Sequence, residues 1–268
     1  MVVRGSQTSA RWLRPCNDVV YPTSHLVCLP HAGGTAQAYR SWPGRLPADV
    51  AVHSVQYPGR QDRLREPAAE ALTDLVGPIA DELTALLGSP LTLFGHSMGA
   101  IVAYEVTLEL QRRHGAVVDL LAVSGSRAPD QREPGDKHKL TDAALIAEIS
   151  RVNSTFGDLL AAPELLELVL PTIRADYQLI GGYDRTAVVP VRAPMLAMGG
   201  DADPDVSRAD LLQWSRFSSA GFDSAVFPGG HFYLVADEAS VLRRLACSLP
   251  SGATRRHQRV AVQQPSNS

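Results

Sequence analysis

The chain has 268 residues, with 25 Lys and Arg against 28 Asp and Glu, so its formal net charge is −3. Hydrophobic residues make up 45% and charged residues 20%, close to an average globular protein. This near-neutral balance, without a basic block, argues against nucleic acid or an anionic membrane as the main partner. The length suits one α/β domain with an inserted element, and such a chain can bury a large core without disulfides or metals.

Cysteine usage and hydropathy indicate where the protein works. Cys16, Cys28 and Cys247 are widely spaced and match neither a zinc ligand set nor a disulfide framework, so we expect buried or incidental thiols. The first nine residues lack an apolar signal-peptide core, and no window approaches the ~18 apolar residues of a membrane span. We therefore expect a cytoplasmic protein that contacts neither membrane nor nucleic acid.

Short apolar runs alternate with helical patterns along most of the chain. Residues 1–23 mix Arg, Pro, Ser and Asn without a period and are expected to form a loose leader. Strands are predicted over 25–30, 50–57, 91–96, 120–124, 195–198 and 225–227. Between them, 68–87 carries an apolar stripe of helical period that Pro78 interrupts, and 98–113 is apolar almost all round at its start. This alternation predicts a doubly wound, mostly parallel sheet.

Residues 130–190 break the alternation. The stretches 140–149, 163–170 and 173–180 are helical in pattern, and no convincing strand lies among them. We expect a helical insertion after the strand at 120–124, where insertions in such sheets commonly cover the active-site edge. The domain then extends over 24–250, and the polar tail 251–268 is expected to be disordered.

The sharpest chemical signal is Gly95-His96-Ser97-Met98-Gly99, a G-x-S-x-G motif. An apolar strand leads into it and an apolar helix leads out, which is the strand–turn–helix context of a nucleophile elbow. Glycines on both sides allow a tight turn that exposes the Ser97 hydroxyl. The sequence therefore predicts Ser97 as a nucleophile.

A serine hydroxyl needs an oriented base, and in α/β-hydrolases the chain order is Ser, then acid, then His. Among the eight histidines, His231 follows the last predicted strand through Pro228-Gly229-Gly230, at the sheet edge where Ser97 is also expected. The alternative is an ordinary loop histidine that packs on its aromatic neighbours. We take His231 as the candidate base.

Three carboxylates compete for the role of the acid, in the loop after the strand at 195–198. Asp203 is favoured because Pro204 restricts it to an extended backbone that can aim its carboxylate at the base. Asp201 is the fallback, and Asp205 is expected to be a solvated surface carboxylate. Position along the chain does not decide between Asp203 and Asp201.

An oxyanion hole needs two preorganised N–H donors. The N–H of Met98, directly after the nucleophile, is one candidate. The second is the N–H of Ala32, because the loop after the first predicted strand contains Gly33 and Gly34, which let the backbone approach a substrate oxygen. An ordinary glycine turn is the alternative.

Six segments between about residues 25 and 246 form a combined pattern: 29–34 (LPHAGG), 55–60 (VQYPGR) with Arg63 and Glu66-Pro67, 94–100 (FGHSMGA), 170–176 (LPTIRAD), 199–204 (GGDADP) and 227–234 (FPGGHFYL). Together they resemble the type II thioesterases that accompany polyketide synthases and nonribosomal peptide synthetases, members of the α/β-hydrolase superfamily.

The resemblance implies a catalytic Ser97, Asp203 and His231, with oxyanion donors at Ala32 and Met98. It implies hydrolysis of acyl thioesters from the phosphopantetheine arm of acyl or peptidyl carrier domains, and an editing role that clears short, decarboxylated or misprimed acyl groups. The resemblance also implies that the helical insertion at 130–190 is a lid over the acyl-binding chamber. No metal or organic cofactor is implied, since the phosphopantetheine belongs to the carrier.

Two other functions use the same fold. A small-molecule carboxylesterase or an acyltransferase would use the same three side chains, whereas a non-catalytic binding module would be expected to have lost one of them. Arg60 and Arg63 prompt a separate hypothesis: their charge and loop position would suit contact with an acidic carrier surface, although solvated or internally paired arginines are the commoner case.

Overall fold

The computed structural model describes residues 12–115, 117–153 and 163–250. Seven strands form one sheet in the order β1-β3-β2-β4-β5-β6-β7. Their bounds are Leu13–Pro15 (β1), Ser24–Leu29 (β2), Val50–Val55 (β3), Leu91–His96 (β4), Leu120–Ser124 (β5), Met195–Gly200 (β6) and Phe222–Phe227 (β7). Only the pairing of β1 with β3 is antiparallel in this sheet. The predicted mostly parallel α/β-hydrolase sheet is confirmed.

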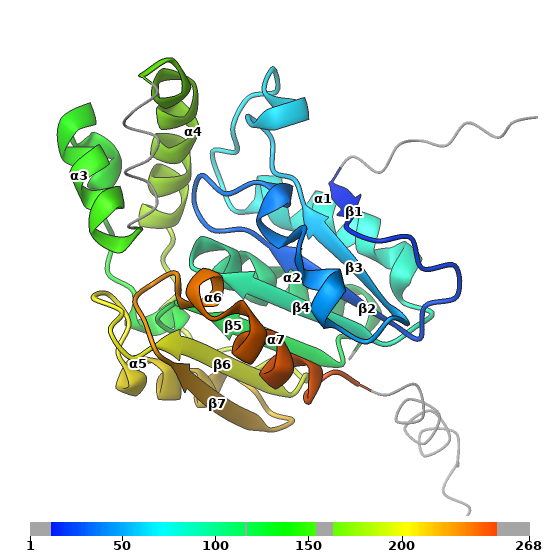
Figure 1. Ribbon diagram of the computed structural model, residues 1–268. Helices are drawn as coiled ribbons and strands as arrows, with labels where there is room; N and C mark the ends of the chain where they lie inside the picture. Colours follow the sequence, from blue (N-terminus) through cyan, green and yellow to red (C-terminus); the bar gives the residue numbers. More distant parts are fainter. Residues whose placement is uncertain (1–11, 116, 154–162, 251–268) are drawn as a thin grey trace, which may run out of the picture.

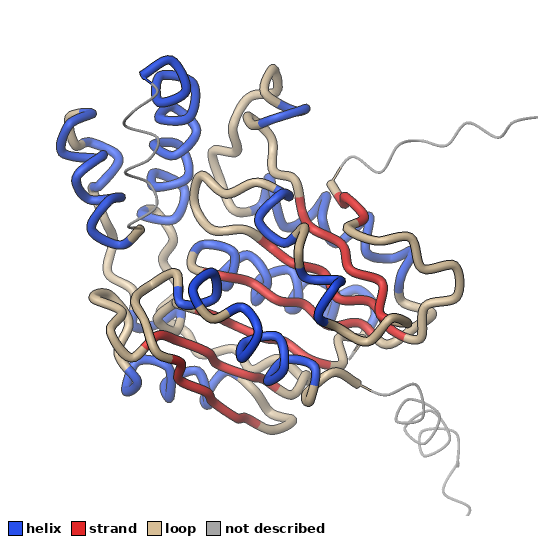
Figure 2. The backbone as a smooth tube through the Cα atoms, in the orientation of Figure 1, coloured by secondary structure: helices blue, strands red, loops and turns tan. Residues whose placement is uncertain are grey.

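Helices cover both faces of the sheet (Figures 1 and 2). Their bounds are Thr73–Leu83 (α1), Met98–His114 (α2), Asp142–Val152 (α3), Pro163–Gly181 (α4), Arg208–Gln213 (α5), Tyr233–Ala236 (α6) and Glu238–Ala246 (α7). Short 3₁₀ turns join them, among them Ala36–Tyr39 and Trp42–Arg45 before β3 and Trp214–Phe217 after α5.

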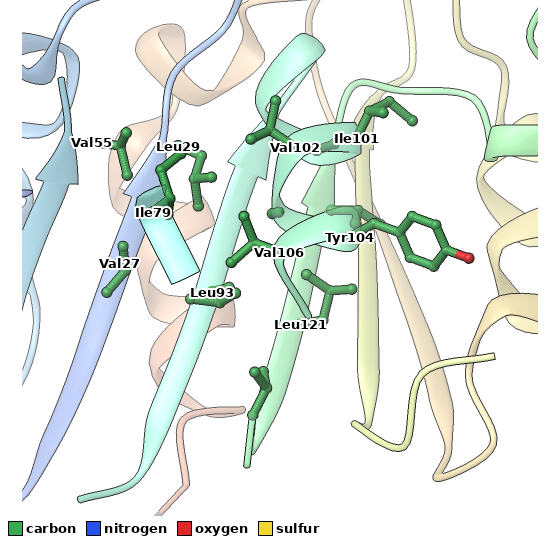
Figure 3. Packing of buried hydrophobic residues seen from close by; sticks show 14 of the residues in the cluster. Val27, Leu29, Val55, Ile79, Leu93, Ile101, Val102, Tyr104, Val106 and Leu121 are labelled. Carbon is green, nitrogen blue, oxygen red and sulfur yellow. The ribbon is translucent and has the colours of Figure 1, made fainter. Parts of the chain in front are cut away.

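Side chains alternate along each central strand, so each face of the sheet has its own core. One core joins Val27, Leu93 and Leu121 to α1, α2 and the segment 211–217 (Figure 3). The opposite core joins the intervening strand residues to α7 and to the aromatic side chains of Tyr39 and Trp42. Burial on both faces explains why these strands are continuous apolar runs in the sequence.

The helical insertion lies between β5 and β6, as predicted, and includes α3 and α4. These two helices stand together, away from the body of the sheet (Figure 1), and pack through a separate cluster of Leu145, Ile149, Leu170 and Ile173. The insertion therefore has a small core of its own.

Two sequence expectations are corrected here. Residues 12–15 do not belong to a loose leader, because Trp12 and Leu13 are buried and β1 pairs with β3. The stretches 163–170 and 173–180 form one helix, α4, which continues through Pro171. Residues 1–11 and the expected disordered tail 251–268 lie outside the described residues.

Candidate active site

Ser97 occupies a strained turn between β4 and α2. Its backbone has φ 56° and ψ −116°, a conformation that non-glycine residues rarely adopt, and its N–H donates to the Ser124 carbonyl at the end of β5 (2.8 Å). A Cβ on Gly95 would lie 2.0 Å from the Gly99 oxygen, and one on Gly99 would lie 2.0 Å from the Leu29 oxygen. The two glycines of the motif are therefore required by close backbone contacts around the serine.

The loops after β6 and β7 bring Asp203 and His231 together. His231 Nδ1 lies 2.8 Å from Asp203 Oδ2, and both side chains are buried. The other oxygen of Asp203 accepts from the backbone N–H groups of Asp205 and Val206, at 2.9 and 3.3 Å, which fixes the carboxylate. With Nδ1 held in this way, Nε2 is the ring nitrogen that remains for proton transfer.

The other two carboxylates of this loop have different partners. Asp201 accepts from the N–H of Gly229 (2.9 Å) and stabilises the turn that leads to His231. Asp205 is not simply a solvated surface group, because it pairs with Arg151 (2.7 Å) and lines the cavity described next. Of the two candidates that sequence position left open, the structure brings Asp203 to the histidine.

A cavity of about 290 Å³ joins the predicted site residues. Ser97, His231, Ala32 and Met98 all contribute to its lining, which continues onto α4 through residues such as Tyr177. Met98 is the first residue of α2, so its N–H has no carbonyl four residues earlier in the helix to bond to. The four residues meet at the carboxyl ends of β2, β4 and β7, where strand order reverses between β2 and β4.

The loop that carries Ala32 is a tight turn anchored from the insertion. The Gly34 N–H donates to the His31 carbonyl (2.9 Å), and Gly33 has φ +73°, as the third position of a type II turn requires. The Gly33 N–H donates to Asp176 of α4 (2.7 Å). A side chain at Gly33 would also collide with Ile173, since a Cβ there would lie 2.5 Å from its Cγ1.

Asp176 is held in turn by Arg60. Two guanidinium nitrogens donate to the two carboxylate oxygens at 2.8 Å each, and the Arg60 Nη1 also donates to the Gly34 carbonyl (3.1 Å). Both side chains are buried, at 5% and 7% exposure. This network binds α4, the turn after β2 and the loop after β3 into one unit.

The hypothesis that Arg60 and Arg63 contact a carrier surface is wrong, because both are buried. Arg63 pairs with Glu66 (2.7 Å), donates to the Gln56 carbonyl (2.7 Å) and lies over the Trp12 ring. Their positive charge is satisfied within the protein and is not available to a partner.

Two further histidines pack beside the candidate base. His96 is fully buried, its ring centre lies 4.9 Å from that of His231, and its Nδ1 is 2.9 Å from Ser124 Oγ, which contacts the Tyr233 hydroxyl (2.6 Å). Burial holds the pKa of His96 well below its usual value. Burial also lowers the pKa of His31 to about 4, an effect to which the charges of His231 and Arg60 add. Both rings are therefore neutral at pH 7, and the environment of His231 gains no fixed positive charge from them.

Sequence reasoning missed these supporting residues. Arg60 and Asp176 lie inside the motifs VQYPGR and LPTIRAD, and His96 lies inside the elbow motif, but nothing in the sequence pairs them. Gly125 was also missed: it has φ +55°, and a Cβ there would lie 2.6 Å from the His96 ring.

Comparison with known proteins shows to which family the chain belongs. The family model described as the thioesterase domain matches residues 24–248. The chain belongs to the thioesterase family. Thioesterase PikA5 of Streptomyces venezuelae is 40% identical over 228 residues, which cover 84% of this chain and 81% of PikA5.

Solved structures show the same relationship. The type II thioesterase BorB from the borrelidin biosynthetic cluster superimposes with a TM-score of 0.82 at 34% identity, covering 89% of this chain and 98% of BorB. RedJ, a thioesterase of the prodiginine pathway in Streptomyces coelicolor, gives 0.81 at 36% identity, with 87% and 88% coverage. The resemblance to type II thioesterases of polyketide and nonribosomal peptide biosynthesis is confirmed, and with it the assignment of this thioesterase as a serine hydrolase.

All three cysteines of the thioesterase are unpaired thiols, with Cys28 buried and Cys247 exposed. No helix among the described residues is long and apolar enough to cross a membrane. Within the same ranges, no group of three or more His, Cys, Asp and Glu side chains is placed to hold a metal ion.

Proposed function

We propose that this thioesterase hydrolyses acyl groups from the phosphopantetheine arm of carrier domains through an acyl-enzyme on Ser97. The observation that carries the proposal is the single cavity in which Ser97, His231, Ala32 and Met98 meet, next to the His231–Asp203 hydrogen bond. The chemistry follows from these positions in two steps.

In the first step, His231 Nε2 takes the proton of the Ser97 hydroxyl as Oγ attacks the thioester carbonyl carbon. The developing imidazolium is stabilised by Asp203, which accepts from Nδ1. The oxyanion of the tetrahedral intermediate accepts hydrogen bonds from the N–H groups of Ala32 and Met98, each worth about 3 kcal/mol of barrier. The C–S bond then breaks, and His231 returns the proton to the thiolate of the arm.

In the second step, water attacks the ester carbonyl of acyl-Ser97. His231 takes a proton from the water and gives it back to Ser97 Oγ as the C–O bond breaks. The products are a free carboxylic acid and the regenerated serine. These steps use only groups of the chain, the substrate and a water molecule, so we propose that neither a metal nor an organic cofactor takes part.

Support for a carrier-bound substrate comes from the relatives. BorB is a type II thioesterase from the borrelidin biosynthetic cluster, and YbtT is a type II thioesterase from the yersiniabactin pathway of nonribosomal peptide and polyketide synthesis. Each of the two matches covers 89% of this chain. We propose an acyl or peptidyl carrier domain of a cytoplasmic synthase as the partner, and removal of short or misprimed acyl groups as the editing task.

The test is an intact-mass measurement of a carrier protein loaded with acetyl, propionyl or longer acyl groups. The wild type is expected to unload the carrier, and Ser97→Ala is expected to leave it loaded. Ser41→Ala, which alters an exposed serine away from the cavity, is the matched control and should behave as wild type. Unloading by Ser97→Ala at the wild-type rate would exclude the mechanism, and a higher kcat/KM on p-nitrophenyl esters than on acyl carriers would favour a carboxylesterase.

A further inference from the structure

Three buried polar side chains form a hydrogen-bonded chain behind the candidate base, and the two-step mechanism does not use them. The Tyr233 hydroxyl lies 2.6 Å from Ser124 Oγ, which in turn lies 2.9 Å from His96 Nδ1. All three residues are fully buried, and they come from the start of α6 and the ends of β5 and β4. Because a buried polar group that lacks a hydrogen bond is costly, such a chain has a preferred direction of donation.

The direction of these hydrogen bonds decides which nitrogen of His96 carries the hydrogen. If Tyr233 donates to Ser124 and Ser124 donates to Nδ1 of His96, the neutral ring carries its hydrogen on Nε2. Within this chain only that Nε2, which is shielded from solvent, then lacks a partner among the described residues. The opposite direction would leave two groups unmatched, the hydroxyl hydrogen of Tyr233 and the lone pair of Nε2. The first direction is therefore favoured.

The ring of His96 packs against the ring of His231. The ring centres are 4.9 Å apart, and Phe232 lies edge-on to both rings at 5.3 Å from each. Gly125 also touches both, since a Cβ there would lie 2.6 Å from His96 Cε1 and 3.4 Å from His231 Cε1. The hydrogen bond to Asp203 holds His231 at Nδ1 but leaves the ring free to tilt about that bond. Close packing by a neighbour that is itself fixed removes this freedom.

The same chain of hydrogen bonds reaches the nucleophile. The carbonyl of Ser124 accepts from the N–H of Ser97 (2.8 Å), while its hydroxyl lies between His96 and Tyr233. His96 directly precedes Ser97 in the chain, and Tyr233 follows His231 by two residues. Ser124 therefore joins the turn that carries the nucleophile to the segment that carries the base.

Resting on the function proposed above, we propose that His96, as the Nε2–H tautomer held by Ser124, is a positioning residue that keeps the His231 ring aligned with the nucleophile. The ring of His96 has to be neutral in this role, because His231 gains a positive charge during proton transfer and a second buried charge beside it would oppose that step. Burial, together with the neighbouring His231 and His31, holds the pKa of His96 well below its usual value. The missing acceptor at Nε2 has the same effect, since nothing there would stabilise a cation.

The test removes the hydroxyl groups of the chain one at a time. Ser124→Ala breaks both hydrogen bonds, whereas Tyr233→Phe leaves the bond from Ser124 to His96 in place. Two rates are measured well below Tm: hydrolysis of an acyl-N-acetylcysteamine thioester, and phosphonylation by a fluorophosphonate, in which the oxygen of the nucleophile displaces fluoride from phosphorus while His231 takes the proton. We expect kcat and the phosphonylation rate to fall about tenfold or more in Ser124→Ala while KM changes little, and to fall less in Tyr233→Phe.

Two matched controls remove the same groups elsewhere in the core. Ser54→Ala deletes a buried strand hydroxyl that has no partner among the described residues. Tyr104→Phe deletes a tyrosine hydroxyl that donates to the Val189 carbonyl (2.7 Å). Both variants should keep the wild-type kcat and phosphonylation rate, although Tyr104→Phe should lower Tm about as much as Tyr233→Phe does, since each loses one hydrogen bond.

NMR spectroscopy of the imidazole groups tests positioning directly. Nitrogen-15 spectra should show His96 of the wild type as the neutral Nε2–H tautomer at pH 7. The hydrogen that His231 Nδ1 donates to Asp203 should give a downfield proton resonance. This resonance should weaken or shift in Ser124→Ala and stay in place in Ser54→Ala, a difference that a general loss of stability would not produce.

Several results would overturn the proposal. One is an unchanged kcat and phosphonylation rate in Ser124→Ala, and another is the Nδ1–H tautomer or a charged ring for His96 at pH 7. Equal losses in Ser124→Ala and Ser54→Ala would reduce the effect to core packing. The phosphonylation rate and the NMR spectra do not depend on the acyl substrate. A wild type that unloads no acyl carrier would therefore refute the proposed function alone, and the two other measurements would still decide the role of His96.

Discussion

Replacing Asp176 by Asn tests whether the insertion holds in place the turn after β2, which carries the proposed oxyanion donor Ala32. The carboxylate of Asp176 accepts three hydrogen bonds, two from Arg60 at 2.8 Å and one from the Gly33 N–H at 2.7 Å. An asparagine keeps one acceptor oxygen and removes the negative charge. The Arg60 guanidinium, on a side chain that is only 5% exposed, is then left without its counter-ion.

The expected loss of stability follows from the burial of the Arg60–Asp176 ion pair. Breaking a buried ion pair by removing one partner lowers the free energy of unfolding by about 3–5 kcal/mol. At about 2–4 °C per kcal/mol for a domain of this size, Asp176→Asn should lower Tm by about 6–20 °C. Since the turn carries Ala32, the proposed oxyanion donor that would act only in the transition state, we expect kcat to fall about tenfold or more while KM changes little.

The assay combines urea unfolding with steady-state hydrolysis of an acyl carrier at a temperature well below Tm. Asp142→Asn is the matched control, because Asp142 pairs with Arg174 in the same insertion but its side chain is 72% exposed; its loss should cost less than about 1 kcal/mol. The double variant Arg60→Met/Asp176→Leu should recover stability more than activity. A stability within about 1 kcal/mol of wild type together with an unchanged kcat for Asp176→Asn would refute the reasoning.

Three further outcomes are expected. Asp203→Asn should lower kcat by about 10³–10⁴ because the histidine loses its oriented acceptor, whereas Asp201→Asn should stay near wild type in the same hydrolysis assay; equal losses would contradict the assignment. Gly99→Ala places a Cβ 2.0 Å from a backbone oxygen of β2 and should cost about 3 kcal/mol or more in urea unfolding, while Gly44→Ala, with open space around it, should cost little. His53 is one of four described histidines whose pKa burial lowers, in its case to about 4. The unfolded chain therefore binds more protons between pH 6.5 and 4, so the free energy of unfolding should fall as pH drops through that window, and less steeply in His53→Asn.

The sheet was predictable where burial on both faces makes the strand a continuous apolar run. β4 and β5 match the predicted bounds, whereas β7 begins three residues earlier than predicted, because Asp223 and Ser224 are tolerated on an edge strand. β1 was missed because Leu13–Pro15 is three residues long and contains Arg and Pro. It forms only because Trp12 and Leu13 find buried places beside β3, which is a tertiary effect.

Some residues of the candidate site could likewise be predicted from the sequence, and others could not. Ser97, Asp203 and His231 were predictable as candidates because each lies within a few residues of the end of a strand, and the carboxyl ends of parallel strands share one edge. The choice between Asp203 and Asp201 needed coordinates, because both lie in the same loop and only the turn geometry separates them. The Arg60–Asp176 ion pair gave no local signal, since the two residues lie 116 positions apart in the sequence and meet only in the fold.

The contacts around the turn after β2 also limit how the insertion can move. Gly99 of α2 packs beneath this turn, and Ile173 and Asp176 of α4 pack against it, with Asp176 tied to it through the Gly33 N–H. Thr172 adds a hydrogen bond to the Gly59 carbonyl (2.7 Å), in the loop after β3. A movement of the whole of α4 would have to break the buried Arg60–Asp176 pair or carry the turn after β2 with it. The segment 172–176 is therefore tied to the turn after β2, whereas α3 contacts α4 through the separate apolar cluster of the insertion.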